Sequence, residues 1–357
     1  KFAKMSLVAA VAVAGLTNVS ASSLEEAVKN TDVSGKVYVE FVADDNGVAG
    51  GSTATTTDLD FDITFKSKVN DNVTSVVRMQ ADAAPAEGAT SSNHTFDLDL
   101  LYFNYAKNNL SVDFGRFGLD TPSTDGNQAE GVNASYKLDM VTLGAGYAVS
   151  SETTTGDLAY ASAMGTVGPV NLEAWYVAFS PATVDAGKNF TFAASTTVEG
   201  FNLAARYATT DYNTASTEDG KTFKLTASTT ISNVSVHGTY LTTAEEGAAY
   251  QEDWSDANGY ELSQLDLGEL STNAADSTLW ALGAAIPVNA VTYALDYATL
   301  SEDVSNQEAQ ELRLRATHKM SSNFTIMATY SMYDEEDASG ATTVENDSSR
   351  IDFKYSF

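Results

Sequence analysis

Cysteine is absent from the 357 residues, and histidine occurs only three times, at His94, His237 and His318. Without cysteine, the chain has no disulfide framework, no thiolate nucleophile, no iron–sulfur cluster and no cysteine zinc site. The three histidines are far apart in sequence, and no two of them have the short spacing of a metal-binding pair. We therefore expect neither covalent cross-links nor a histidine metal site.

Basic residues are also scarce, because 19 Lys and Arg stand against 48 Asp and Glu and give a net charge of -29. Proteins that bind nucleic acid use clustered lysine and arginine to release counterions. This composition therefore excludes nucleic acid as a partner. The chain is nevertheless 43% hydrophobic and has only 5 prolines, which is typical of a folded protein rather than a disordered one.

Long hydrophobic runs are missing too. The clearest apolar run, residues 5–16, follows two lysines and precedes small residues that end at Ala21. A membrane helix needs about 20 apolar residues, whereas this shorter layout is that of a secretory signal peptide. We predict a cleaved signal peptide over residues 1–21 and a short periplasmic segment over residues 22–31. If the remaining chain enters a membrane, it must cross as strands.

Apolar residues from position 32 onward alternate with polar ones, with a period of two. In residues 59–65, for example, Leu59, Phe61 and Ile63 would share one face and Asp60 and Asp62 the other. Such strands have one oily and one wet face. If lipid rather than a protein core covers the apolar face, the other half of every strand faces water. A membrane protein built of such strands can therefore have a mean hydropathy of only -0.17.

The connections between these strands alternate between short turns and long polar segments, and each strand would span roughly 8 to 12 residues. Short turns are expected near residues 70–72, 107–109, 139–140, 167–169, 199–200, 232–233, 287–289 and 321–322. Long connections are expected at residues 44–54, 83–93, 117–128, 150–156, 180–188, 210–220, 242–276, 301–307 and 333–349. We predict an all-β fold over residues 32–357, a transmembrane antiparallel β-barrel of about 18 strands with long extracellular loops and short periplasmic turns.

Three short motifs carry a family resemblance. Residues 23–29 (SLEEAVK) followed by 32–35 (DVSG), residues 115–122 (GRFGLDTP), and the closing aromatic strand that ends in YSF resemble the major outer membrane porin family of Campylobacter and its epsilonproteobacterial relatives. The resemblance implies a homotrimeric general porin with a cation-favouring channel. It also implies that residues 115–122 open the loop that constricts the pore.

Strand parity predicts which charged residues line the channel, since they lie opposite the oily faces. The predicted lumen wall contains Asp58, Asp60, Asp62, Arg78, Asp97, Asp99, Asp113, Arg206, Arg313 and Arg315. We expect a basic arc of this wall to face an acidic loop, as a transverse field at a constriction requires. The competing interpretation is a solvated strand face with no special geometry.

Arg116 breaks the alternation, because Phe114 is expected to face lipid. We expect a bulge at Gly115 to turn Arg116 inward, since a lipid-facing arginine at mid-membrane costs roughly 2 to 4 kcal/mol. The loop that follows carries Asp120, Asp125 and Glu130, which with Arg116 form the predicted pore constriction. This acidic constriction could accommodate a divalent cation, and no other cofactor is expected.

These patterns predict an exported bacterial outer-membrane porin that lies in lipid and passes small hydrophilic solutes and ions by diffusion, with weak cation selectivity. We expect no enzymatic activity. Ser235 and His237 share one strand face, but two polar residues on a wet strand are more often lumen lining than a nucleophile and its base. The alternative is a structural or adhesive surface β-protein, although the calcium-binding repeats that would favour it are missing.

Overall fold

The structure is a computed structural model that describes residues 29–46, 53–83, 95–124, 127–151, 156–180, 186–212, 219–250, 275–304 and 307–357. The predicted signal peptide and the constriction candidate Asp125 lie outside these ranges. Within them, no helix is long and apolar enough to cross a membrane.

Eighteen antiparallel strands form the described part of the chain. Their bounds are β1 (Thr31–Asn46), β2 (Thr53–Lys68), β3 (Val73–Ala83), β4 (Thr95–Lys107), β5 (Leu110–Gly118), β6 (Gln128–Lys137), β7 (Val141–Ser151), β8 (Leu158–Val167), β9 (Val170–Phe179), β10 (Ala186–Val198), β11 (Phe201–Tyr212), β12 (Gly220–Ile231), β13 (Val234–Thr243), β14 (Ser277–Val288), β15 (Val291–Glu302), β16 (Gln307–Lys319), β17 (Phe324–Glu336) and β18 (Thr342–Ser356).

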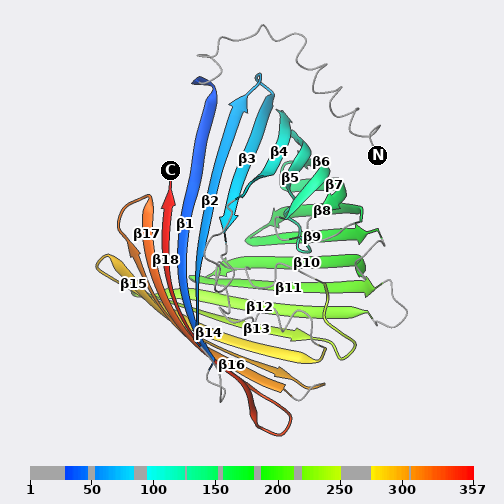
Figure 1. The fold of residues 1–357 in the computed structure, drawn as a ribbon. Helices are drawn as coiled ribbons and strands as arrows, with labels where there is room; N and C mark the ends of the chain where they lie inside the picture. The colour runs from blue at the N-terminus through cyan, green and yellow to red at the C-terminus, as the bar shows by residue number, and fades with distance from the viewer. Residues whose placement is uncertain are drawn as a thin grey trace.

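The strands close into a barrel, because each pairs with its neighbour in sequence and β1 pairs with β18 (Figure 1). At this seam the ladder runs from Lys36 opposite Ser356 to Asn46 opposite Asn346. Gly35 and Phe357 exchange two backbone hydrogen bonds of 3.0 Å at its end. Closure leaves no strand edge unpaired. The predicted all-β barrel of 18 strands is confirmed.

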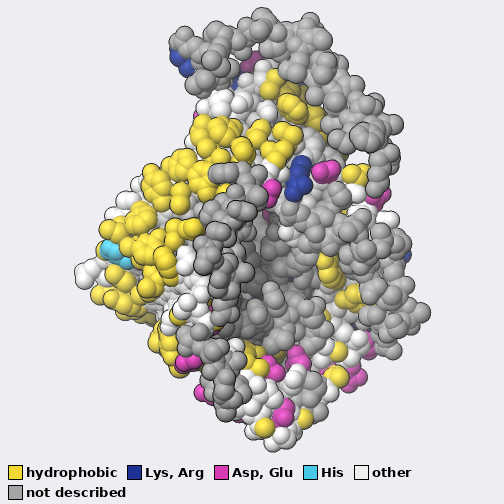
Figure 2. Space-filling model, in the orientation of Figure 1, with side chains coloured by type: hydrophobic (Ala, Val, Ile, Leu, Met, Phe, Trp, Pro, Cys, Tyr) yellow, Lys and Arg dark blue, Asp and Glu magenta, His cyan; other side chains and the backbone are white. Residues whose placement is uncertain are grey.

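The outer face of the barrel is hydrophobic, and Figure 2 shows these side chains gathered on the wall, with many acidic ones toward its lower end. Phe41, Leu59, Leu295, Leu314 and Ile351 are all exposed. They follow the predicted alternation, so the polar residues between them point inward. A barrel of 16 to 18 strands is wide enough to hold an aqueous channel.

The short turns fall where the sequence predicts them, and several depend on residues with positive φ. Asn108 has φ 53°, Gly168 60° and Glu199 51°, and Ser232 and Asn289 have similar values. Two-residue hairpins use such left-handed residues because their twist matches that of the flanking strands.

Two expectations about the strands are wrong. Residues 333–349 do not form a long connection, because pairing continues to Glu336 opposite Thr342 and leaves only residues 337–341 as the turn. In β4 a bulge opposite Arg78 and Met79 shifts the alternation. Leu98 and Leu101 are therefore exposed, whereas Leu100, which strict alternation would put on the same face as Leu98, is buried.

The turn between β17 and β18 is closed by Asp337. Its carboxylate accepts hydrogen bonds from the Ser339 hydroxyl (2.6 Å), the Ser339 amide (2.8 Å) and the Ala341 amide (3.1 Å). These bonds, the Ser339 hydroxyl first, hold the pKa of Asp337 below its ordinary value because they favour the ionised form.

Candidate functional site: the channel interior

The predicted acids of β2 lie on the inner face in register with β1. Asp58, Asp60 and Asp62 stand opposite Glu40, Tyr38 and Lys36 respectively. Lys36 Nζ lies 3.1 Å from Asp62 Oδ2. The charge of Asp62 is therefore offset by a neighbouring cation on the wall.

The seam between β1 and β18 holds a cluster that the sequence analysis did not single out. Arg350 Nε lies 2.6 Å from Glu40 Oε2 and 2.7 Å from Asp352 Oδ1. The Tyr38 hydroxyl lies 2.8 Å from Glu40 Oε2 and 2.5 Å from Asp352 Oδ1. The alternation of inward and outward residues places each of these side chains inside the barrel. The four meet, however, only because β1 pairs with β18 in this register.

Arg78 and Asp99, both predicted to line the lumen, form an ion pair across β3 and β4. Asp99 is buried, whereas Asp97 on the same strand is exposed. Asp113 on β5 accepts hydrogen bonds from the side-chain amides of Asn104 (2.7 Å) and Asn133 (3.3 Å). These partners are neutral, so they orient the Asp113 carboxylate without offsetting its charge.

Arg313 and Arg315 converge on Asp296, a residue that the sequence analysis missed. Arg313 Nη2 lies 3.2 Å and Arg315 Nη2 4.0 Å from Asp296 Oδ2, and His237 Nε2 lies 3.3 Å from Oδ1. His237 and Asp296 meet across β14 because Gly283 stands between them, and a Cβ there would lie 2.1 Å from the imidazole. With Arg78 and Arg350 also paired, these arginines do not form the separate basic arc that the sequence analysis expected.

The described part of the loop after β5 (residues 119–124 and 127), which we call the constriction loop, folds into the barrel. Its side chains at Leu119, Thr121, Ser123 and Thr124 are at most 3% exposed. The Thr121 and Thr124 hydroxyls lie 2.9 Å apart, and the Leu119 amide donates to the Asn127 carbonyl (2.9 Å). The loop is thus a compact inward turn.

Aromatic and aliphatic side chains hold the constriction loop against the wall. Phe117 and Leu119 pack in a buried cluster with Ala129, Ala148, Leu158, Tyr160, Val177 and Phe179 of β6 to β9. Tyr102, Trp175, Tyr212 and Tyr250 border this cluster. The loop therefore lies along one side of the barrel, with Asp120 exposed on it.

The bulge predicted at Gly115 is wrong, since both ladders of β5 keep their register through this residue. Arg116 stands opposite Leu101, which is exposed on the outer face, and opposite Glu130. Arg116 Nη1 lies 4.0 Å from Glu130 Oε1, and Arg116 Nε donates to the Asp99 carbonyl (2.9 Å). The register therefore puts Arg116 and Glu130 on the outer face, where each partly neutralises the other.

A second inward piece, which we call the inner segment (residues 244–250), follows β13. It runs across the inner face of β12, β11 and β10 and forms hydrogen bonds with each of these strands. The Ala249 amide donates to Thr222 Oγ1 (2.9 Å) and the Tyr250 amide to Thr210 Oγ1 (2.8 Å). Asn189 Nδ2 donates to the Tyr250 carbonyl (2.7 Å), and the Tyr212 hydroxyl to the Ala248 carbonyl (2.8 Å).

The inner segment reaches the cluster beneath the constriction loop. Tyr250 stacks edge-on against Phe179, with ring centroids 5.6 Å apart. Residues 242–276 are predicted from the sequence to be an extracellular loop, but the first part of this connection turns inward. The wall residues that receive it, Asn189, Thr210 and Thr222, are ordinary polar strand residues and give no sign of this contact, whereas the aromatic Tyr250 is too apolar for a freely solvated loop and was the available signal.

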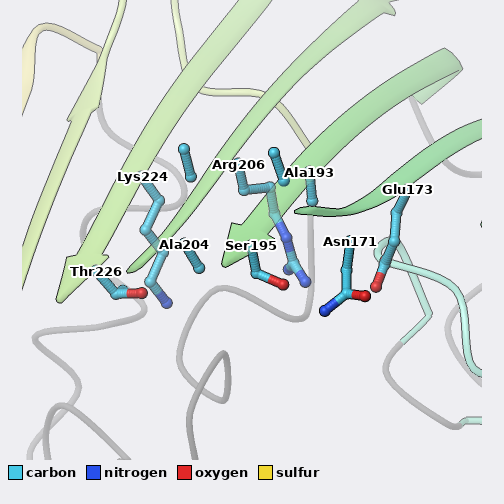
Figure 3. Close-up of a pocket in the computed structure, with 10 residues that line it drawn as sticks. Asn171, Glu173, Ala193, Ser195, Ala204, Arg206, Lys224 and Thr226 are labelled. Carbon is cyan, nitrogen blue, oxygen red and sulfur yellow. The ribbon is translucent and has the colours of Figure 1, made fainter. Parts of the chain in front are cut away.

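Arg206 lies elsewhere on the wall, in a pocket between β9 and β12 that also contains Lys224 and Glu173 (Figure 3). Its neighbours, Ala193 and Ala204, are small. The predicted wall residues are thus distributed around the barrel, and most of them lie in local clusters with residues of adjacent strands.

The pattern of the Campylobacter major outer membrane protein family matches residues 1–163. The family resemblance is confirmed. Since this is a family of porins and the fold is a closed barrel, the chain is an outer-membrane porin and not an enzyme. No curated protein matches the sequence.

Several solved structures share the fold of this chain at low sequence identity. OccAB4 of Acinetobacter baumannii has a TM-score of 0.70 and 11% identity over 92% of this chain and 99% of its own. OpdQ of Pseudomonas aeruginosa has a TM-score of 0.71 and 12% identity over the same shares. OccK2 (OpdF) of Pseudomonas aeruginosa, solved in complex with glucuronate, has a TM-score of 0.70 and 11% identity over 92% of this chain and 98% of its own.

Proposed function

We propose that this porin forms a water-filled channel through which small hydrophilic solutes and ions diffuse passively, with weak cation selectivity. The observation that carries the proposal is the constriction loop, buried inside a closed barrel whose inner wall carries many polar and charged side chains. A loop that narrows a lumen without filling it makes a sieve, since barrels of this strand number are too wide for side chains to plug.

Carboxylates near the constriction loop support the cation preference. Asp120 is exposed on the loop, and Asp113 on the adjacent strand has neutral amide partners. Charges on the outside of the barrel act less, because the screening length is about 8 Å at physiological salt. By this argument Asp120 contributes to selectivity, whereas Glu130, which the register puts on the outer face beside Arg116, contributes little.

Osmotic swelling of liposomes tests passive diffusion. We expect proteoliposomes to swell in neutral sugars at rates that fall steadily with sugar size and do not saturate with concentration. Swelling no faster than that of empty liposomes, with the barrel folded, would favour the structural or adhesive alternative.

Charge-neutralising variants test the selectivity. Asp120→Asn should lower the cation-to-anion permeability ratio, measured as the reversal potential across a planar bilayer in a salt gradient. Glu130→Gln, a matched control that removes one carboxylate nearby, should leave this ratio almost unchanged. The opposite ranking of the two variants would refute the assignment of Asp120 to the constriction.

The sequence adds three further parts to the proposal: assembly as a homotrimer, which the family resemblance implies; export through a cleaved signal peptide over residues 1–21, which the short apolar run predicts; and a divalent cation at the constriction, which its carboxylates could bind. Light scattering in mild detergent tests the first, and sequencing the N-terminus of the exported protein tests the second. The described residues contain no group of three or more His, Cys, Asp or Glu that could hold a metal. A divalent ion would therefore need Asp120 together with carboxylates beyond the described ranges.

A further inference from the structure

One ion pair on the outer wall lies within the membrane-spanning part of the barrel. Arg116 is the seventh residue of β5 counted from the short turn before Leu110, and Glu130 is the eighth residue of β6 counted from the short turn after Lys137. A transmembrane strand needs about 9–11 residues to cross a bilayer. Both charged side chains therefore stand on the wall before their strands have completed the crossing.

The other acidic and basic side chains on the outer face of the described strands lie near the membrane surfaces. Lys107 and His318 are beside short turns, as the first and second residues of their strands. The remaining ones are the tenth residue or later. Lys188 and Asp211 are an example, because they lie 3.9 Å apart and each is the eleventh residue from its short turn. Among the described strands, only the pair on β5 and β6 interrupts the apolar belt.

Exposed apolar side chains surround this pair on the outer face. Leu101 lies opposite Arg116 on β4, and Val132 follows Glu130 on the outer face of β6. Tyr147, opposite Val132 on β7, is exposed as well. The Glu130 side chain is itself 57% exposed, so its carboxylate would meet lipid in an isolated barrel. Lipid chains do not solvate ionised groups, and pairing two charges offsets only part of the cost of removing them from water.

The wall beside this pair is flat enough for another protein to approach it closely. The outer face of β8 is formed by Ala159, Ala161, Ala163 and Gly165, with Val167 at the short turn. Small residues at protein contacts within membranes let two backbones come close together. The charged pair and this flat strand lie on neighbouring parts of one wall, since β6, β7 and β8 are paired in order.

We propose that the outer face of β5 to β8 is the contact surface for a second copy of this chain, with Arg116 of one copy facing Glu130 of the next. In a cyclic oligomer the same part of every copy meets around the symmetry axis. Each copy then supplies a carboxylate for one neighbour and a guanidinium for the other, and lipid is excluded from both charges. An anionic lipid headgroup complements Arg116 alone and is repelled by Glu130, so a second copy fits the pair better.

This surface rests on the homotrimer in the proposed function and adds which strands meet at its axis. The absence of cysteine makes single-cysteine cross-linking specific. Val132→Cys puts a thiol beside the charged pair, and Leu295→Cys is the matched control. Val132 is 48% and Leu295 47% exposed on the outer wall, and β15 lies nine strands from β6, across the barrel from it.

A short bismaleimide is added to outer membranes that contain each cysteine variant, and the boiled protein is separated on a denaturing gel. We expect Val132→Cys to give a band of two linked chains and Leu295→Cys to remain a single chain. Cross-linking through Leu295→Cys alone, through both variants equally or through neither would overturn the assignment of this face.

Charge reversal tests the ion pair itself. Arg116→Glu and Glu130→Arg each place like charges at the axis, so each should lose the unboiled oligomer band at a temperature at which the wild type keeps it. Lys188→Glu is the matched control, since it reverses one charge of the outer-face pair near the membrane surface, and it should leave the band unchanged.

Co-expression separates pairing between copies from pairing within one copy. Chains with Arg116→Glu and chains with Glu130→Arg, carrying different tags, have no internal pair but complement each other across the contact. We expect oligomers that contain both tags to keep their band at the temperature at which either variant alone loses it. Mixed oligomers no more stable than those of the single variants would overturn the pairing between copies.

Two further outcomes distinguish this inference from the proposals on which it rests. A monomer by light scattering in mild detergent would overturn the homotrimer together with this surface, while the channel function is judged separately by conductance. A Glu130→Arg protein more stable than the wild type, with Arg116→Glu less stable, would indicate a lipid phosphate at Arg116 and overturn the second copy as the occupant.

Discussion

The inner segment offers the sharpest mutational test, because one glycine decides whether it can dock. A Cβ on Gly220 would lie 1.9 Å from the Ala248 carbonyl oxygen and 2.5 Å from its carbon. These are backbone atoms, which cannot swing aside as the end of a flexible side chain can. The Gly220→Ala variant should therefore displace the inner segment while the strand itself tolerates alanine.

Four hydrogen bonds join residues 248–250 of the inner segment to β10, β11 and β12. At about 0.5–1.5 kcal/mol net for each, they contribute about 2–6 kcal/mol in total. Loss of about 4 kcal/mol lowers the ratio of docked to undocked segment roughly a thousandfold. We therefore expect the segment to leave the wall in nearly every molecule.

Single-channel conductance in symmetric salt measures the result. Gly220→Ala should conduct more than the wild type, since backbone is removed from the lumen. Gly238→Ala is the matched control, because its Cβ would meet only the flexible Leu282 Cδ2 at 3.1 Å among its close neighbours. If a folded Gly220→Ala protein keeps wild-type conductance, the inner segment does not narrow the channel.

Three further predictions follow from the barrel and its ion pairs. The closed barrel should migrate differently on a denaturing gel before and after boiling, whereas identical migration would count against closure. Asp296→Asn leaves the buried Arg313 without its carboxylate, so it should cost about 3–5 kcal/mol and lower the temperature of that gel transition, while exposed Asp97→Asn should not. Because the pKa of Asp337 is lowered, its contribution to the β17–β18 turn should be complete above about pH 3.9, the unfolded value, and be lost as the pH falls through the lower folded value. The protection factor of the Ser339 amide against hydrogen exchange should fall as this contribution is lost. A protection factor that is already low at neutral pH would contradict the prediction.

Alternation and turn chemistry were enough to predict the barrel. Residues such as Leu59 and Asp60 show their faces in the sequence, because a strand has a period of two whatever its partners are. Turns at Asn108 and Gly168 are similarly local, since they depend on residues that tolerate positive φ.

The contacts inside the channel could not be predicted, because they depend on register between strands distant in sequence. Asp296 meets Arg313 only through the pairing of β15 with β16, and Glu40 meets Arg350 only through closure. Arg116 was placed on the wrong face because the bulge lies in β4, one strand away from the predicted position at Gly115. The docking of the inner segment depends on the path of the chain beyond β13, which no strand pattern encodes.

The reversal potential of the wild-type channel in a potassium chloride gradient tests the central claim most directly. A water-filled, weakly cation-selective porin should show stepwise, ohmic conductance and a reversal potential of the sign set by potassium, but well below the value for ideal selectivity. A reversal potential of the sign set by chloride, or a folded barrel that conducts no ions, would contradict the account.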